Sequence, residues 1–173
     1  MNRLERFANR ADAITDAVGR LTAWLVLAVI TLLFAQLPLR EVFGGGHIRA
    51  NDFGQIVHAT VFMCGLSYAL RWDRHVRMDI FYRRMRPRTQ ALVNLAGSAL
   101  FLLPWCGLMV WFGWSYMVRS VVALELFPDT WTPGYFVFKV LLVACIGLLG
   151  LQAASLAARS LLVLLGNHPA ARP

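Results

Sequence analysis

Charged residues are scarce in this chain, and acidic residues are the scarcest of them. Only 15% of the 173 residues are charged, with 9 Asp and Glu against 17 Lys and Arg. A soluble domain carries about a quarter charged residues. Because 58% of the residues are hydrophobic as well, the composition argues against an ordinary water-soluble domain.

Four long runs contain no Asp, Glu, Lys or Arg. They cover residues 21–39, 53–70, 89–118 and 140–158. A helix rises about 1.5 Å per residue, so about 20 apolar residues cross ~30 Å of hydrocarbon. We therefore predict an all-α integral membrane protein, a single domain over 1–173 with four transmembrane helices. The predicted spans are about 20–40, 53–70, 89–118 and 134–164.

Cysteine is scarce too, and its three copies form no framework. Cys64, Cys106 and Cys145 each lie inside a predicted span, and none belongs to a CxxC pair. Isolated cysteines in odd number indicate small buried apolar residues, not disulfides or a metal site. The first apolar run is 19 residues long and precedes no small-x-small cleavage site, so we expect it to be retained as a helix.

Motifs for catalysis and for ion coupling are missing as well. The sequence contains no nucleophile elbow, P-loop, zinc spacing or pair of catalytic carboxylates. A self-sufficient ion-coupled transporter needs a carboxylate or an unwound polar segment at membrane depth, but no Asp or Glu falls in the four runs and no inverted repeat is visible. We predict no enzyme, no cofactor and no coupling machinery in this chain itself.

Basic residues gather at the ends of the apolar runs, above all over residues 71–88. This segment holds seven arginines against Asp73 and Asp79. Arginines beside spans stay on the cytoplasmic side, because moving them across the bilayer is expensive. With both termini inside, thirteen of the seventeen basic residues lie inside, so we predict an N-in, C-in topology. We expect no nucleic-acid partner, since these residues set topology.

Two segments are predicted to lie along the membrane surface. Residues 1–19 form an amphipathic helix with one apolar stripe, although a solvated tail is the alternative. The stripe consists of Leu4, Phe7, Ala11, Ile14 and Val18. Between the second and third spans, a short interfacial helix carries Val76, Ile80, Phe81 and Met85 on one side. Its neighbouring arginines would reach the phosphates of anionic lipids: Arg71, Arg74, Arg83, Arg84, Arg86 and Arg88.

The second predicted span is unusually polar. It carries Gln55, His58, Ser67 and Tyr68 and follows Asn51 and Asp52, which are good N-cap residues. Such a span should pack against protein on one side. A haem at His58 would need a second histidine facing it from another span, but the other histidines lie in predicted loops or tails. We interpret His58 as a hydrogen-bonded packing residue.

The second half of the chain offers three further features. Pro104 interrupts the third run and predicts a kink. Gly150, Ala154 and Ala158 recur every four residues, a small-residue stripe that lets another helix approach closely. Lys139, one to two turns inside the fourth span, could pair with Glu125, bind a partner protein or extend to the outer interface.

The order of several short motifs resembles a known family, the small permease subunit of TRAP (tripartite ATP-independent periplasmic) transporters. A G-x-x-Y-A-L run at 65–70 precedes His75, Val76, Arg77, Met78 and Asp79, which match the family's H-V-[RK]-x-D signature. Glu125, a P-D-T-W-T-P run ending at Pro133, Lys139 and L-L-G-L-Q at 148–152 follow in the family's order. The resemblance covers roughly residues 20–160.

The resemblance implies a multi-pass subunit of the bacterial inner membrane that has two protein partners. A large permease subunit would move an organic acid with sodium, and a periplasmic substrate-binding protein would deliver it. This chain would scaffold the permease, and the loop around 125–133 could help to dock the binding protein. The alternatives are a four-helix membrane anchor of a redox enzyme and a small multidrug exporter. The substrate cannot be read from this chain, because the residues expected to contact it belong to the partners.

Overall fold

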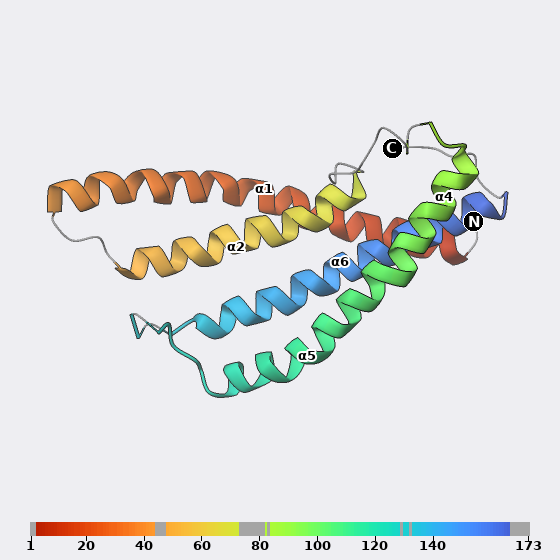
Figure 1. Ribbon diagram of the computed structural model, residues 1–173. Coiled ribbons are helices and arrows are strands. Elements are labelled where there is room, and N and C mark those ends of the chain that lie inside the picture. Colours follow the sequence, from red (N-terminus) through yellow and green to blue (C-terminus); the bar gives the residue numbers. More distant parts are fainter. Residues whose placement is uncertain are drawn as a thin grey trace.

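The computed structural model describes residues 3–43, 48–72, 82, 84–128, 130–131 and 133–166. Its elements are α1 (Arg3–Phe43), α2 (Ile48–Arg71), α4 (Pro87–Ala96), the π-helical η1 (Gly97–Leu102), α5 (Leu103–Val122) and α6 (Tyr135–Leu164), as Figure 1 shows. Four stretches are long and apolar enough to cross a membrane: 3–36, 52–71, 87–122 and 135–164. The predicted all-α fold with four membrane-spanning helices is confirmed.

The first helix is longer than predicted, because α1 continues without a break from Arg3 to Phe43. The segment expected as a separate helix at 1–19 is therefore the first half of α1, since no helix-breaking residue separates it from the span. Its buried face consists of small side chains, with Ala8, Ala11 and Thr15 almost inaccessible. Three apolar side chains of the predicted stripe remain exposed, namely Leu4, Phe7 and Ile14.

Helix α6 is the centre of the bundle and packs against α1, α2, α4 and α5. In Figure 1, α6 runs beside α2 on one side and α5 on the other. Small side chains make this possible, because Ala153 and Ser155 are fully buried. A Cβ atom built at Gly150 would lie 3.3 Å from Cys106 Cβ. The first residue of the small-residue stripe thus faces α5, while Ala158 is buried and Ala154 half-buried.

The third span contains a wide turn directly before its proline. Residues 97–102 are π-helical, and the Leu103 N–H donates to the Ser98 carbonyl, five residues earlier. Pro104 has no N–H to donate, so the wider turn accommodates the missing bond. The rod from Pro87 to Val122 bends between α4 and α5 in Figure 1. The irregularity predicted at Pro104 is thus a π-helical segment that precedes it.

The start of the second helix corrects a prediction. Helix α2 begins at Ile48, so Asn51 and Asp52 lie inside its first turns and do not cap it. The Asp52 side chain is buried and accepts a hydrogen bond from Thr130 Oγ1. Asp52, which was predicted to cap α2, therefore ties this helix to the segment between α5 and α6.

The three cysteines are all free and buried, as predicted. The Sγ atoms of Cys64 on α2 and Cys145 on α6 are 3.4 Å apart. Cys106 lies with Leu70 and Leu149 in the apolar cluster where α2, α5 and α6 meet. The cysteines serve as small packing residues at the contacts of the central helix.

Candidate functional site

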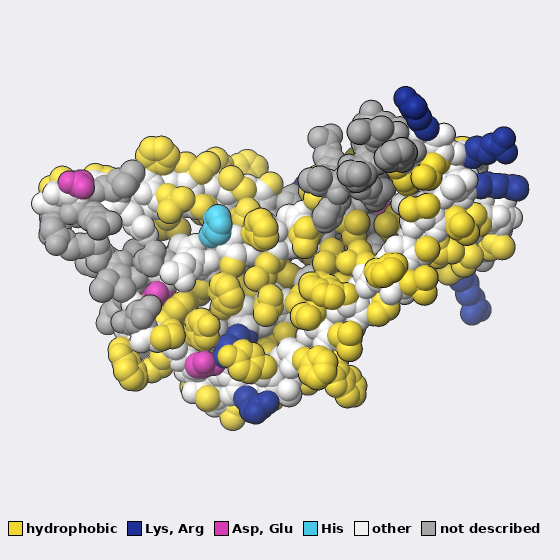
Figure 2. All heavy atoms as spheres, viewed as in Figure 1, with side chains coloured by type: hydrophobic (Ala, Val, Ile, Leu, Met, Phe, Trp, Pro, Cys, Tyr) yellow, Lys and Arg dark blue, Asp and Glu magenta, His cyan; other side chains and the backbone are white. Residues whose placement is uncertain are grey.

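The structure places charged side chains at opposite ends of the bundle. We call the end where α1 begins and α6 ends the terminal end, and the end where α1 finishes and α6 begins the loop end (Figure 1). A cluster around Asp12 lies toward the terminal end, and a cluster around Glu125 lies at the loop end. Figure 2 shows Lys and Arg side chains gathered at the terminal end.

Asp12 is the centre of the cluster toward the terminal end. Its carboxylate is 5% exposed and accepts hydrogen bonds from three side chains of α6. Ser155 Oγ lies 2.6 Å and Gln152 Nε2 3.1 Å from Oδ1, while Arg159 Nε lies 2.9 Å from Oδ2. The arginine also donates to Asn9 at 3.0 Å. One buried carboxylate thus fastens the first half of α1 to the last third of α6.

Arg71 joins α2 to the same cluster. Its Nη1 atom lies 2.6 Å from Asp12 Oδ2, and its Nε atom lies 2.6 Å from Asp16 Oδ1. The guanidinium also stands over the Trp72 ring at 5.4 Å. Two carboxylates of α1 thus already pair with its guanidinium, and binding of Arg71 to lipid stays a prediction. Sequence reasoning missed the cluster because it joins three helices that are far apart in the chain.

Three other predicted lipid-binding arginines stand where solvent or lipid can reach them. Arg84, Arg86 and Arg88 are exposed before and at the start of α4, beside exposed Met85. Binding to lipid phosphates stays a prediction for them. The other predicted residues of this stretch lie outside the described part of the chain: Arg74, His75, Val76, Arg77, Asp79, Ile80, Phe81 and Arg83.

Glu125 and Lys139 pair with each other at the loop end. Lys139 Nζ donates to Glu125 Oε2, and Ser120 Oγ donates to the same oxygen at 2.5 Å. The lysine is only 6% exposed, and its Nζ lies 3.9 Å from the centroid of the Tyr116 ring. Lys139 is thus the buried partner of a carboxylate whose side chain is 37% exposed, and it does not extend freely to an interface. This decides between the alternatives left open above.

The backbone between α5 and α6 folds back to hold this pair. Leu126 and Pro133 form an isolated antiparallel bridge, and buried Phe127 meets the Tyr135 ring edge-on at 5.4 Å. Gly134, the residue directly before α6, has a φ of 141°. A residue with a side chain rarely adopts this value. Pro133, predicted from the resemblance, therefore belongs to the turn that positions Lys139.

The ion pair predicts how acid affects the loop end. The hydrogen bond from Lys139, followed by that from Ser120, lowers the pKa of Glu125 from its ordinary value of 4.5. A lowered pKa gives stability that is complete above the ordinary value and is lost as the pH falls through the lowered one. We expect no pH dependence from this pair near neutrality and a loss only in acid.

Glu125→Gln tests this pair, because it leaves Lys139 buried without a counter-charge. We expect its thermal midpoint at pH 7 to fall by at least roughly 2–4 °C. The fall in stability that the natural chain shows in acid as Glu125 is protonated should be absent from the variant. Glu41→Gln is the matched control, since Glu41 is exposed near the end of α1. Equal midpoints for Glu125→Gln and the natural chain would show that the pair does not stabilise the fold.

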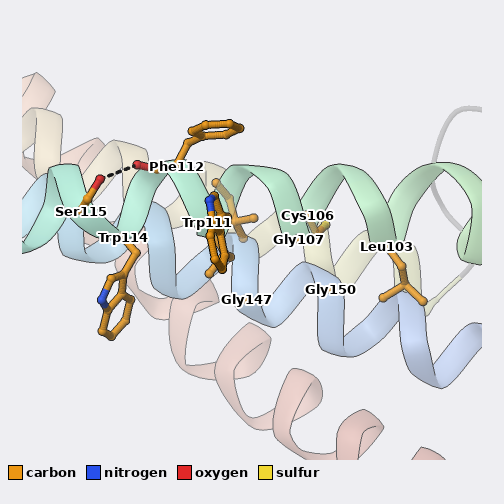
Figure 3. A pocket seen from close by; sticks show the side chains of 11 residues that line it. Leu103, Cys106, Gly107, Trp111, Phe112, Trp114, Ser115, Gly147 and Gly150 are labelled. Carbon is orange, nitrogen blue, oxygen red and sulfur yellow. Dashed lines mark hydrogen bonds between the residues drawn. The ribbon is translucent and has the colours of Figure 1, made fainter.

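An open groove runs along the outer side of α5 and α6, with a volume of about 710 Å³. Figure 3 shows Trp111 of α5 beside Gly147 of α6, with Trp114 further along α5 and Gly150 nearer Cys106. Its one hydroxyl, Ser115 Oγ, donates to the Phe112 carbonyl at 3.4 Å. Without convergent polar groups, the groove offers packing surface and no site for an ionic substrate.

Metal-binding chemistry finds no support in the described residues, where no three His, Cys, Asp or Glu side chains could hold one ion. His58 differs from the prediction, because it is exposed on α2 and makes no hydrogen bond within the described part of the chain. It is therefore not a packing residue inside this chain.

Comparison with known proteins gives one match. The family described as "Tripartite ATP-independent periplasmic transporters, DctQ component" matches residues 29–163. No curated protein and no solved structure matches significantly. The matched range begins within α1 and ends within α6, so it contains the loop-end pair and the α2 and α6 members of the Asp12 cluster. Asp12 and Asp16 themselves precede it.

Proposed function

Because the chain belongs to the DctQ component family of the tripartite ATP-independent periplasmic transporters, we propose that it is the stationary scaffold of a sodium-coupled organic-acid importer. Family membership makes it the small subunit of a tripartite ATP-independent periplasmic transporter and not an enzyme. It is a multi-pass protein of the inner membrane that associates with a large permease and a periplasmic binding protein. The redox anchor and the multidrug exporter are set aside by this membership.

One observation supports the scaffold role most strongly. Every buried or half-buried carboxylate of the described chain already has a partner. Asp12 and Asp16 bind arginines, and Glu125 binds a lysine, while Asp52 and Glu5 also have partners. An ion-coupling site built on a carboxylate needs one that can change its occupancy during transport. We therefore assign sodium coupling and movement of the organic acid to the large permease.

The two charged clusters suit a part that keeps its shape during transport. The Asp12 cluster ties α1, α2 and α6 together, and the Glu125 pair ties the segment after α5 to α6. Packed elements that share buried ion pairs do not slide past one another without breaking them. We propose that the four helices act as one rigid body beside the moving part of the permease.

The orientation follows from the positions of the basic residues. Arg84, Arg86 and Arg88 are exposed at the terminal end, which we place at the cytoplasmic surface, where they would meet anionic lipids. The loop end then faces the periplasm. Its exposed Trp131, Leu124 and Leu126 form a surface that the binding protein could contact.

Co-purification tests the proposed assembly. When an affinity tag is placed on this chain, we expect it to recover an equal amount of the large permease from membranes that express both. Membranes with an untagged version of this chain are the control and should yield no permease. If the tag recovers this chain alone, although the permease is stable under the same conditions, the scaffold role is contradicted.

A further inference from the structure

Helix α2 turns one face, which carries two polar side chains without hydrogen bonds, away from the rest of the described chain. Gln55, His58, Phe62 and Leu66 are all exposed, and their spacing of three and four residues places them on one side of the helix. The opposite side, with Val57, Cys64, Ser67 and Leu70, is buried.

The depth of His58 makes this exposure expensive. His58 follows Asp52 by six residues, so it lies ~9 Å further along the helix axis, inside the uncharged run 53–70. Hydrocarbon offers no donor or acceptor, and polar side chains within membrane spans almost always face protein or a water-filled cavity. An imidazole with one donor and one acceptor therefore needs a partner that the described part of this chain does not supply.

Other polar side chains on exposed or half-buried faces of the spans solve this problem locally. Thr60 Oγ1 donates to the Ile56 carbonyl at 2.7 Å, and Thr31 Oγ1 donates to the Leu27 carbonyl at 2.8 Å. Neither His58 nor Gln55 makes such a bond with any described residue. The two threonine hydroxyls can therefore face lipid, because their hydrogen bonds are made within the helix. The side chains of His58 and Gln55 cannot face lipid without losing theirs.

We infer that the α2 face of Gln55, His58, Phe62 and Leu66 is covered by a membrane-embedded segment of the large permease. That segment carries a hydrogen-bonding side chain or a free backbone carbonyl at the depth of His58. Phe62, 73% exposed, supplies the apolar contact one turn deeper. This inference rests on the proposed function, because it names where the permease of that assembly binds.

The test uses the complete two-subunit complex in membranes. His58→Leu keeps an apolar volume but removes both hydrogen-bonding atoms, and we expect it to lower recovery of the permease about five-fold. His58→Gln restores a donor and an acceptor and should restore recovery. Thr60→Val is the matched control, because its lost hydroxyl was satisfied within α2, so recovery should stay normal.

A photoreactive phenylalanine at Phe62 identifies the occupant directly. We expect its cross-linked product to contain the permease. A product containing a second copy of this chain, or normal recovery with His58→Leu, would overturn the inference. If the natural chain recovers no permease at all, the proposed function fails instead, so the two failures are distinguishable.

Discussion

Replacing Asp12 with alanine should be the most damaging single substitution in this chain, with an expected loss of about 3 kcal/mol in the free energy of unfolding. Removing one partner of a buried ion pair costs about 3–5 kcal/mol, because the other charge stays buried. We expect a loss at the lower end of this range for two reasons. Arg71 still has its ion pair with Asp16, and the Arg159 side chain is 48% exposed, so neither arginine is left buried without a counter-charge. Ser155 would lose its side-chain acceptor at the same time.

The three buried thiols allow this loss to be measured without an added label. A maleimide dye that fluoresces on reaction with cysteine reports unfolding, since Cys64, Cys106 and Cys145 are free and buried. Asp16→Ala is the matched control, because Asp16 lies one turn further along α1 and contacts Arg71 alone among the arginines. We expect its loss to be clearly smaller. Equal midpoints for the two variants would contradict the central position of Asp12.

Gly19→Ala should cause the second-largest loss, about 1–3 kcal/mol, although alanine favours helices. A Cβ atom at Gly19 would lie 2.2 Å from Tyr68 Cδ2 and 2.6 Å from Cγ, so α1 and α2 would have to separate. Because Cγ is the ring atom attached to Cβ of Tyr68, a small movement of the hydroxyl end of the ring does not relieve the overlap. The same thiol assay measures the loss.

Two comparisons isolate the steric cause of the Gly19 effect. Gly147→Ala is the matched control, because no atom lies within 4 Å of a Cβ atom built there, so the change should be neutral or stabilising. In a chain that already carries Tyr68→Ala, the further change Gly19→Ala should no longer lower the midpoint, because the ring that it would overlap is gone. An unaltered midpoint for the single variant Gly19→Ala would show that the two helices are not in close contact.

The general architecture could be predicted from the sequence because the membrane imposes a simple rule. Uncharged runs of at least 18 residues must be helical, so the four spans were visible without a structure. The burial of Cys64, Cys106 and Cys145 was predictable too, because isolated cysteines within spans behave as small apolar residues. The wide turn before Pro104 was partly predictable, since a proline within a span requires some local adjustment.

The charged clusters could not be predicted, because they depend on contacts between distant parts of the chain. Asp12 meets Ser155 across 143 positions, and no local spacing indicates that pair. The amphipathic pattern of 1–19 pointed to Leu4, Phe7 and Ile14, whereas the packed face consists of Ala8, Ala11 and Thr15. Close packing selected the small residues, while the large apolar ones remained outside.

The polar residues of α2 show both the strength and the limit of sequence reasoning. The prediction that this span packs against protein on one side fits Ser67, which is fully buried. The same prediction did not separate Ser67 from His58, which faces away from the chain. Only the arrangement of α1, α2 and α6 distinguishes the internal contacts from the face that still needs a partner.

Uptake of a labelled organic acid into proteoliposomes tests the central claim most directly. The vesicles contain this chain alone, the large permease alone, or both, with the binding protein added outside and a sodium gradient directed inward. We predict sodium-dependent uptake only with both subunits, and none with this chain alone. Sodium-driven uptake by this chain alone, or full uptake by the permease without it, would contradict its role as a required scaffold.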